Sequence, residues 1–127
     1  MQDRTLYEYA VVRLVPRVER EEFVNVGVLL YCRKQRYANI LFNVDEGRCE
    51  LLCKDIDFDK IRAHLESMKQ VCLGSKAGGA LAQLDQTERF RWLTAKRSTL
   101  IQCSAVHPGL CLDAEKTHQE LFEKLVL

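Results

Sequence analysis

The amino-acid sequence predicts an α+β fold: an antiparallel sheet of three to five strands with about three helices packed on it, in the order β-β-β-(β)-α-α-β-α. Two observations support this prediction. The first half of the chain holds runs of β-branched and aromatic residues that turn residues separate, as strands do. The second half repeats its apolar residues every three or four positions, which is the spacing of helices that bury one face.

Three or four strands are expected in the first half. Tyr7 to Val15 is rich in β-branched and aromatic residues. Phe23 to Cys32 is almost continuously apolar, which is typical of a central strand covered on both faces, and Gly27 within it indicates a bulge or a close backbone approach. Tyr37 to Val44 is expected to return as the antiparallel partner of that strand. Cys49 to Cys53 is expected to add a short fourth strand.

A long helix is expected between Asp57 and Gly74. Asp57 is a favourable N-cap, and Gly74 stands where a glycine ends a helix. The apolar stripe of this helix consists of Phe58, Ile61, Leu65, Met68 and Val71.

The elements after this helix are shorter. Residues 74–80 are small and predict a loop, and Asp85 is expected to begin a short helix. A strand is expected over Thr99 to Cys103 and a turn over Val106 to Leu110. A last helix is expected after Asp113.

Length and composition predict one globular domain over residues 1–127. Apolar residues make up 47% of the chain and charged residues 29%, with 19 basic against 18 acidic side chains, so neither a disordered chain nor a charged tail is expected. The longest apolar stretch, Val26 to Cys32, is far shorter than the roughly 20 residues that span a bilayer. No secretory signal is visible, and a cytoplasmic location is therefore expected.

The six cysteines are expected to be buried, reduced thiols. Cys49 and Cys53 could in principle form a zinc site together with Cys103, His107 and Cys111. Neither the spacing of Cys49 and Cys53 nor that of Cys103, His107 and Cys111 is common in zinc sites. Two cysteines four residues apart on a strand would also lie about 13 Å apart, too far to share one metal ion. No metal or other cofactor is expected.

The most distinctive segment runs from Arg89 to Thr99, with four basic residues, three hydroxyls and no acid. Arginine forks and hydroxyls suit an anion such as phosphate, and a tryptophan offers a stacking surface for a nucleic-acid base. The alternatives are a solvated helix face and a surface for a protein partner. The candidate binding residues are Arg89, Arg91, Trp92, Lys96, Arg97, Ser98, Thr99 and His107.

No catalytic constellation is recognisable. Ser98, Ser104 or Cys111 could pair with His107 as a base, but no nucleophile-elbow pattern supports such a pair. The glycine pair Gly78-Gly79 lacks the lysine and hydroxyl of a phosphate-binding loop. Enzyme activity therefore has no support in the sequence, and no catalytic residue is assigned.

Four blocks are distinctive in combination: Tyr7 to Arg13 with Pro16, Glu22 to Val28, Arg89 to Ser98, and Val106 to Cys111. Together they resemble a bacterial domain-of-unknown-function family, the one numbered 3037. Members of that family are often encoded beside a HipA-like serine/threonine kinase, so the resemblance implies a two-gene module of toxin–antitoxin-like or regulatory character. It implies no catalytic residues.

Two functions are therefore expected as alternatives. The first is a non-enzymatic accessory protein that binds a HipA-like kinase through the Arg89 to Thr99 segment, the Arg33 to Arg36 hairpin tip and the loop at His107. The second is a nucleic-acid or nucleotide-binding module that uses the cations of Arg89 to Thr99, with phosphodiester chemistry as an extension. The net charge of +1 speaks against extensive nonspecific binding of nucleic acid.

Overall fold

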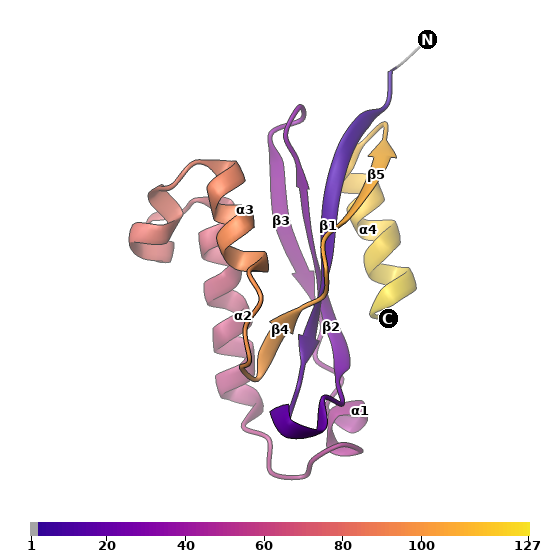
Figure 1. The fold of residues 1–127 in the computed structure, drawn as a ribbon, viewed down its shortest axis with the longest axis vertical. Coiled ribbons are helices and arrows are strands. Elements are labelled where there is room, and N and C mark those ends of the chain that lie inside the picture. The colour runs from indigo at the N-terminus through magenta and orange to yellow at the C-terminus, as the bar shows by residue number, and fades with distance from the viewer. Residues whose placement is uncertain (1–2) are drawn as a thin grey trace.

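The structure, a computed structural model, describes residues 3–127, and five strands in them form one antiparallel sheet (Figure 1). The strands are β1 (Thr5–Leu14), β2 (Val24–Cys32), β3 (Tyr37–Phe42), β4 (Ile101–Cys103) and β5 (His107–Cys111). The sheet order is β3-β2-β1-β4, and β5 also pairs with β1.

The two short strands share one edge of β1. β5 pairs with the first half of β1 and β4 with its last three residues. Ser104 lies in the break between them and bonds to Val11 twice, because its backbone N–H donates to the Val11 carbonyl and its Oγ accepts from the Val11 N–H, both at 2.8 Å. The buried Ser104 side chain thus completes the hydrogen bonds that the break would leave unmade.

Helices cover both faces of the sheet (Figure 1). α2 and α3 pack on one face and α4 on the other, while α1 lies near one end of the sheet. The α+β prediction is therefore confirmed. The helices are α1 (Glu46–Glu50), α2 (Phe58–Leu73), α3 (Gln86–Thr94) and α4 (Ala114–Leu125), with 3₁₀ segments at Val18–Arg20 and Lys76–Gln83.

β2 is the central strand that its apolar run predicts. Every residue from Val26 to Cys32 is buried. Leu29 packs with the residues of α2 and α3, whereas the next residue, Leu30, packs on the α4 side. Successive residues of a strand point to opposite faces, so a strand covered on both sides needs apolar side chains at every position.

Gly27 fulfils both expectations for a glycine inside this strand. The pairing with β1 passes from Val12 opposite Gly27 to Arg13 opposite Asn25, which leaves Val26 as the extra residue of a bulge. The backbone of β3 also comes close, because a Cβ at Gly27 would lie 2.9 Å from the Leu41 carbonyl oxygen.

Gly27→Ala is therefore expected to lower the free energy of unfolding by about 1–3 kcal/mol, the usual cost of overpacking a core. Urea unfolding of the two proteins measures the difference. The control is Gly47→Ala in α1, where a Cβ meets only the Asp45 carboxylate at 3.4 Å and alanine is the better helix former. Unfolding of Gly27→Ala at the wild-type midpoint would contradict the close packing of β2 on β3.

The helix boundaries follow the residues that predict them. Asp57, Asp85 and Asp113 each accept hydrogen bonds from backbone N–H groups in the first turn of α2, α3 and α4. Gly74 ends α2 with φ of 71°, in the left-handed region that glycine adopts without strain.

Two predicted elements are wrong. Cys49 to Cys53 is not a strand: residues 46–50 form α1, because Asp45 caps it by accepting from the Arg48 N–H, and the helix turns Cys49 fully into the core. Val106 to Leu110 is not a turn, since residues 107–111 form β5.

The glycine and proline that indicated a turn have other roles in β5. The Tyr7 ring lies over Gly109, where a Cβ would come within 2.4 Å of it. Pro108 sits in a strand at the edge of the sheet, which is where a residue without an N–H is tolerated. Residues 76–83 also differ from the predicted loop, because they form 3₁₀ turns.

The six cysteines are all free, and four of them are buried: Cys32, Cys49, Cys72 and Cys111. Burial raises the pKa of Cys72 to about 12 and that of Cys103 to about 11, so these two thiols stay protonated at neutral pH. Within residues 3–127, no cluster of three or more His, Cys, Asp or Glu side chains is placed to hold a metal ion. No helix in the same residues has the length and apolar character to cross a membrane.

Candidate functional site

α3 and the connection after it carry the basic segment, but its cations lie in three different places. Arg89 turns inward, where its guanidinium donates to the Leu84 carbonyl oxygen at 2.6 Å. A Cβ at Gly74 would lie 3.1–3.3 Å from the same guanidinium. Arg89 is thus held against the connection that leads into α3, close to the end of α2.

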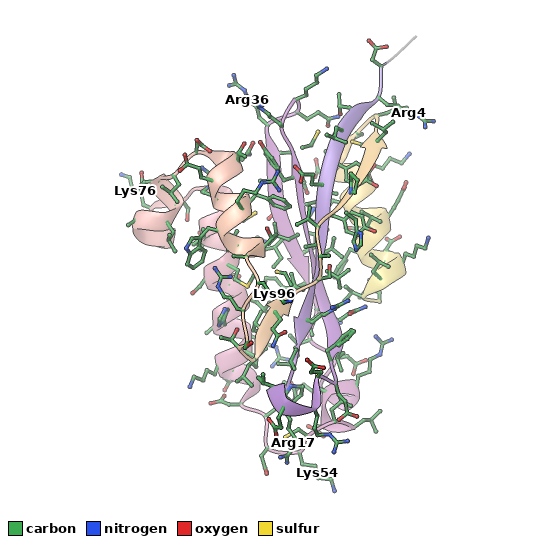
Figure 2. All side chains as sticks on the ribbon, viewed as in Figure 1. Arg4, Arg17, Arg36, Lys54, Lys76 and Lys96 are labelled. Carbon is green, nitrogen blue, oxygen red and sulfur yellow. The ribbon has the colours of Figure 1, made fainter. Side chains whose placement is uncertain are left out.

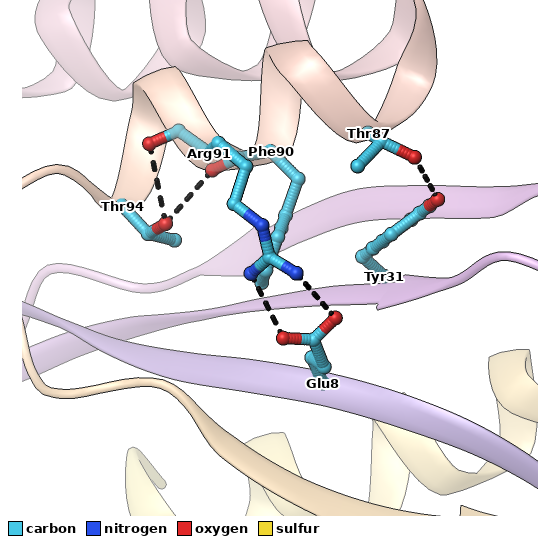
Figure 3. A network of polar contacts seen from close by, with 6 residues as sticks. All are labelled: Glu8, Tyr31, Thr87, Phe90, Arg91 and Thr94. Atoms are coloured by element: carbon cyan, nitrogen blue, oxygen red, sulfur yellow. Dashed lines mark hydrogen bonds and ion pairs between the residues drawn. The ribbon is translucent and has the colours of Figure 1, made fainter.

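Arg91 lies on the exposed side of α3 and connects this helix to β1. Its two terminal nitrogens donate to the two carboxylate oxygens of Glu8 on β1, at 2.8 and 2.9 Å (Figure 3). The hydrogen bond to Glu8 raises the pKa of Arg91. Beside this pair, the hydroxyls of Tyr31 and Thr87 form a hydrogen bond between β2 and the first turn of α3.

These contacts line a groove of about 530 Å³ between α3, the tip of the β2–β3 hairpin and the first half of β1. We call it the hairpin groove. A more open hollow beside it continues along the hairpin tip to Arg36, whose carbonyl oxygen accepts from Gln86 of α3 at 3.1 Å. The groove is lined by Arg4, Thr5, Leu6, Glu8, Tyr31, Arg33, Lys34, Thr87, Arg91 and Leu110.

The hairpin groove combines an apolar floor with a cationic rim. Leu6 and Leu110 are paired across β1 and β5 and are 57% and 61% exposed. Arg4, Arg33 and Lys34 are exposed at its edge, and none of them forms an ion pair with an acid of residues 3–127. Exposed leucines next to unpaired cations are typical of a surface that a partner covers.

Lys96, Arg97 and Ser98 lie in a second place, where they meet Arg13 of β1 and Gln102 of β4. Two adjoining hollows of about 330 and 360 Å³ share Arg13, Lys96, Arg97 and Gln102. We call the pair of hollows the Arg13 groove. Arg13 and Gln102 are opposite each other in the pairing of β1 with β4, which is why the connection from α3 arrives beside them.

Arg97 also fixes the end of α3. Its guanidinium donates to the carbonyl oxygens of Trp92 at 2.6 Å and Leu93 at 3.3 Å, and it lies 4.3 Å from the centre of the Trp92 ring. Trp92 is 43% exposed and supports this arginine from outside the core. The Thr99 hydroxyl donates to the Ile101 carbonyl oxygen at 2.7 Å and shapes the entry into β4.

His107 lies on the other face of the sheet from Arg91. It is exposed on β5, opposite Tyr9, and the two rings are 5.4 Å apart. Tyr9 packs on the α4 side, whereas Glu8, the partner of Arg91, points to α3. The structure thus brings Lys96, Arg97 and Ser98 together and places Arg91 and His107 elsewhere.

Sequence reasoning missed the residues that complete both grooves. Arg13 interrupts a strand of apolar and aromatic residues, and an isolated cation in a buried strand is the one local signal that could have marked it. Gln102, Leu6 and Leu110 carry no such signal, because only the pairing of β4 and β5 with β1 places them.

Comparison with known proteins finds one family. A family model described as Protein of unknown function (DUF3037) matches residues 9–126. No curated protein and no solved structure matches the chain.

Proposed function

We propose that this chain, which belongs to the DUF3037 family, is a non-enzymatic accessory protein that binds an acidic segment of a partner protein in the hairpin groove. The observation that supports the proposal is the meeting of exposed Leu6 and Leu110 with the unpaired cations Arg4, Arg33 and Lys34. A segment with both acidic and apolar side chains would cover the leucines and pair with the cations.

The groove is built to hold its shape. Arg91 and Glu8 tie α3 to β1, Tyr31 and Thr87 tie it to β2, and Gln86 ties it to the hairpin tip. A groove whose walls are already fixed loses little conformational entropy when a partner binds. The only carboxylate that lines it in the described chain, Glu8, is held by Arg91, which leaves the surface free of repulsion toward an acidic partner.

A HipA-like serine/threonine kinase is the partner that we propose, in a two-gene regulatory or toxin–antitoxin-like module. The proposal combines the family's frequent neighbour with the chemistry of the groove. The accessory chain would present its cations to an acidic surface segment of the kinase and bind without changing it covalently.

Charge reversal at the hairpin tip tests the proposal. The variant R33E/K34E is expected to bind the kinase encoded beside this chain about tenfold or more weakly, because two attractive contacts become repulsive. Leu110→Asp, which places an acid on the apolar floor, is expected to weaken the complex as well. Calorimetric titration of the kinase with each full-length variant measures the change.

The matched control is K116E/K124E, which makes the same change of charge on exposed positions of α4. It is expected to bind as the wild type does. Equal losses in both double variants, or no binding by the wild-type chain, would contradict the proposal. If labelled RNA or DNA bound instead, with a steep loss on adding salt and in R33E/K34E, the hairpin groove would be a nucleic-acid site.

A further inference from the structure

Three cations from two separate segments converge in the Arg13 groove. Arg13 comes from the end of β1, and Lys96 and Arg97 come from the connection between α3 and β4; all three line both hollows. None of the three takes part in an ion pair within residues 3–127. The one carboxylate among the lining residues is Glu21, at the edge of one hollow only.

Arg13 has donors that the protein itself does not use. Its Nε is buried and has no hydrogen-bond partner among the described residues, and its side chain makes no other hydrogen bond to them. The guanidinium lies 4.1 Å from the centre of the Phe23 ring, which holds the plane of the fork in place. The Nε is closed off from the groove, so a bound anion would be held by the part of the Arg13 side chain that lines the two hollows.

We propose that the Arg13 groove binds a phosphate monoester dianion. Arg13 supplies a rigid fork of donors and Lys96 a mobile point charge, the two kinds of group that recognise phosphate oxygens. Arg97 adds positive charge while two of its nitrogens stay engaged on the end of α3. Ser98, which is exposed at the rim, adds a hydroxyl donor.

The shape of the site favours a compact anion over a polynucleotide. The cations surround two adjoining hollows of about 330 and 360 Å³, at the lower end of the range of ligand pockets, roughly 300–1,000 Å³. A strand of nucleic acid needs an extended basic track with aromatic rings on which its bases stack. Phe23 and Trp92, two exposed aromatic residues of this region, have Arg13 and Arg97 over their rings instead.

The site is distinct from the hairpin groove. Figure 2 shows Lys96 halfway along the molecule, whereas Arg4 and Arg36 lie at its upper end. The two grooves have no lining residue in common. Loss of one binding function therefore leaves the other one measurable.

Titration of the full chain with inorganic phosphate, followed by backbone amide NMR at constant ionic strength, tests the proposal. Saturable shifts are expected at Arg13, at residues 96–98 and at Gln102. Arg13→Gln and Lys96→Gln are each expected to weaken binding about tenfold or more, the usual effect of removing one charge-assisted contact. Lys60→Gln, an exposed lysine on α2, is the matched control and is expected to bind as the wild type does.

Two phosphate esters identify the source of the anion. O-phosphoserine and adenosine 5′-monophosphate share the phosphate group, and the one that binds more tightly than inorganic phosphate shows which attached group the site accepts. The absence of saturable shifts with all three probes would overturn the proposal. So would shifts that sodium chloride alone reproduces, or equal losses in Lys60→Gln and Lys96→Gln. Because Lys96 is exposed and its side chain forms no hydrogen bond or ion pair within residues 3–127, the Lys96→Gln result stands even if Arg13→Gln fails to fold.

Discussion

Phe90→Ala is expected to lower the free energy of unfolding by about 3–5 kcal/mol, the range that truncation of a buried phenylalanine produces. Phe90 is 1% exposed and lies in the core between α3 and the sheet, with its ring 5.2 Å from that of Tyr31. Removal of the ring leaves a cavity under α3 that the surrounding side chains fill only in part. Urea unfolding followed by circular dichroism measures the loss.

The same variant is expected to disturb both grooves, because α3 carries walls of each. Thr87 and Arg91 line the hairpin groove, and Thr94 lines the Arg13 groove. For the loss of stability, the control is Phe23→Ala, which deletes an equal volume from a side chain that is 45% exposed and is expected to cost clearly less. It is no control for the Arg13 groove, because Phe23 lines that groove. A loss below about 1 kcal/mol for Phe90→Ala would show that α3 does not depend on this contact.

Acid is expected to destabilise the protein through His118. The imidazole is fully buried, and burial lowers its pKa to about 4, against an ordinary value of about 6.5. Nε2–H donates to the Val28 carbonyl oxygen at 2.6 Å, so Nδ1 accepts from the Tyr37 hydroxyl at 2.6 Å. Burial raises the pKa of Tyr37 to about 12, and its hydroxyl therefore remains a donor.

The sign of the effect follows from the lowered pKa. Between pH 6.5 and 4 the unfolded chain takes up a proton at His118 that the folded chain does not. The contribution of His118 to the free energy of unfolding is therefore fully present above pH 6.5. It falls as the pH drops through this window, by about 3 kcal/mol at pH 4. Below pH 4 both states are protonated and the loss stops growing.

Urea unfolding at several pH values, in the wild type and in His118→Ala, measures this contribution. The variant is expected to be less stable at pH 7 and to lose less stability between pH 6.5 and 4. If His118→Ala does not fold, an NMR titration of the wild type reports the same pKa, and a His118 midpoint near pH 6.5 would contradict the prediction.

Local signals in the sequence were enough to predict most of the fold. The unbroken apolar run of β2 identified the central strand, and the aspartates at positions 57, 85 and 113 marked the starts of three helices. A helix cap depends on residues that are neighbours in the sequence, and a strand covered on both faces shows itself as a continuous apolar run. Both can therefore be recognised without knowing the fold.

Contacts between distant residues account for what could not be predicted. Residues 107–111 form a strand because they pair with β1, and the Tyr7 ring leaves room only for a glycine at position 109, although glycine after proline usually indicates a turn. The same limit applies to the site. The basic segment marked Lys96 and Arg97, but Arg13 joins them only because β4 pairs with the end of β1.

The divided edge of β1 has a consequence for the order of folding. β1, β2 and β3 form successive hairpins of neighbouring residues, whereas β5 closes on Thr5 across a separation of 106 positions. Contacts this remote in sequence form slowly, and on the ribosome they must wait until the C-terminal part of the chain has emerged. Until then one side of β1 is an open edge that a strand from a neighbouring nascent chain can occupy. Because the chain breaks at Ser104, two short strands, β4 and β5, close this edge of β1. Each of them forms fewer hydrogen bonds with β1 than one continuous strand would.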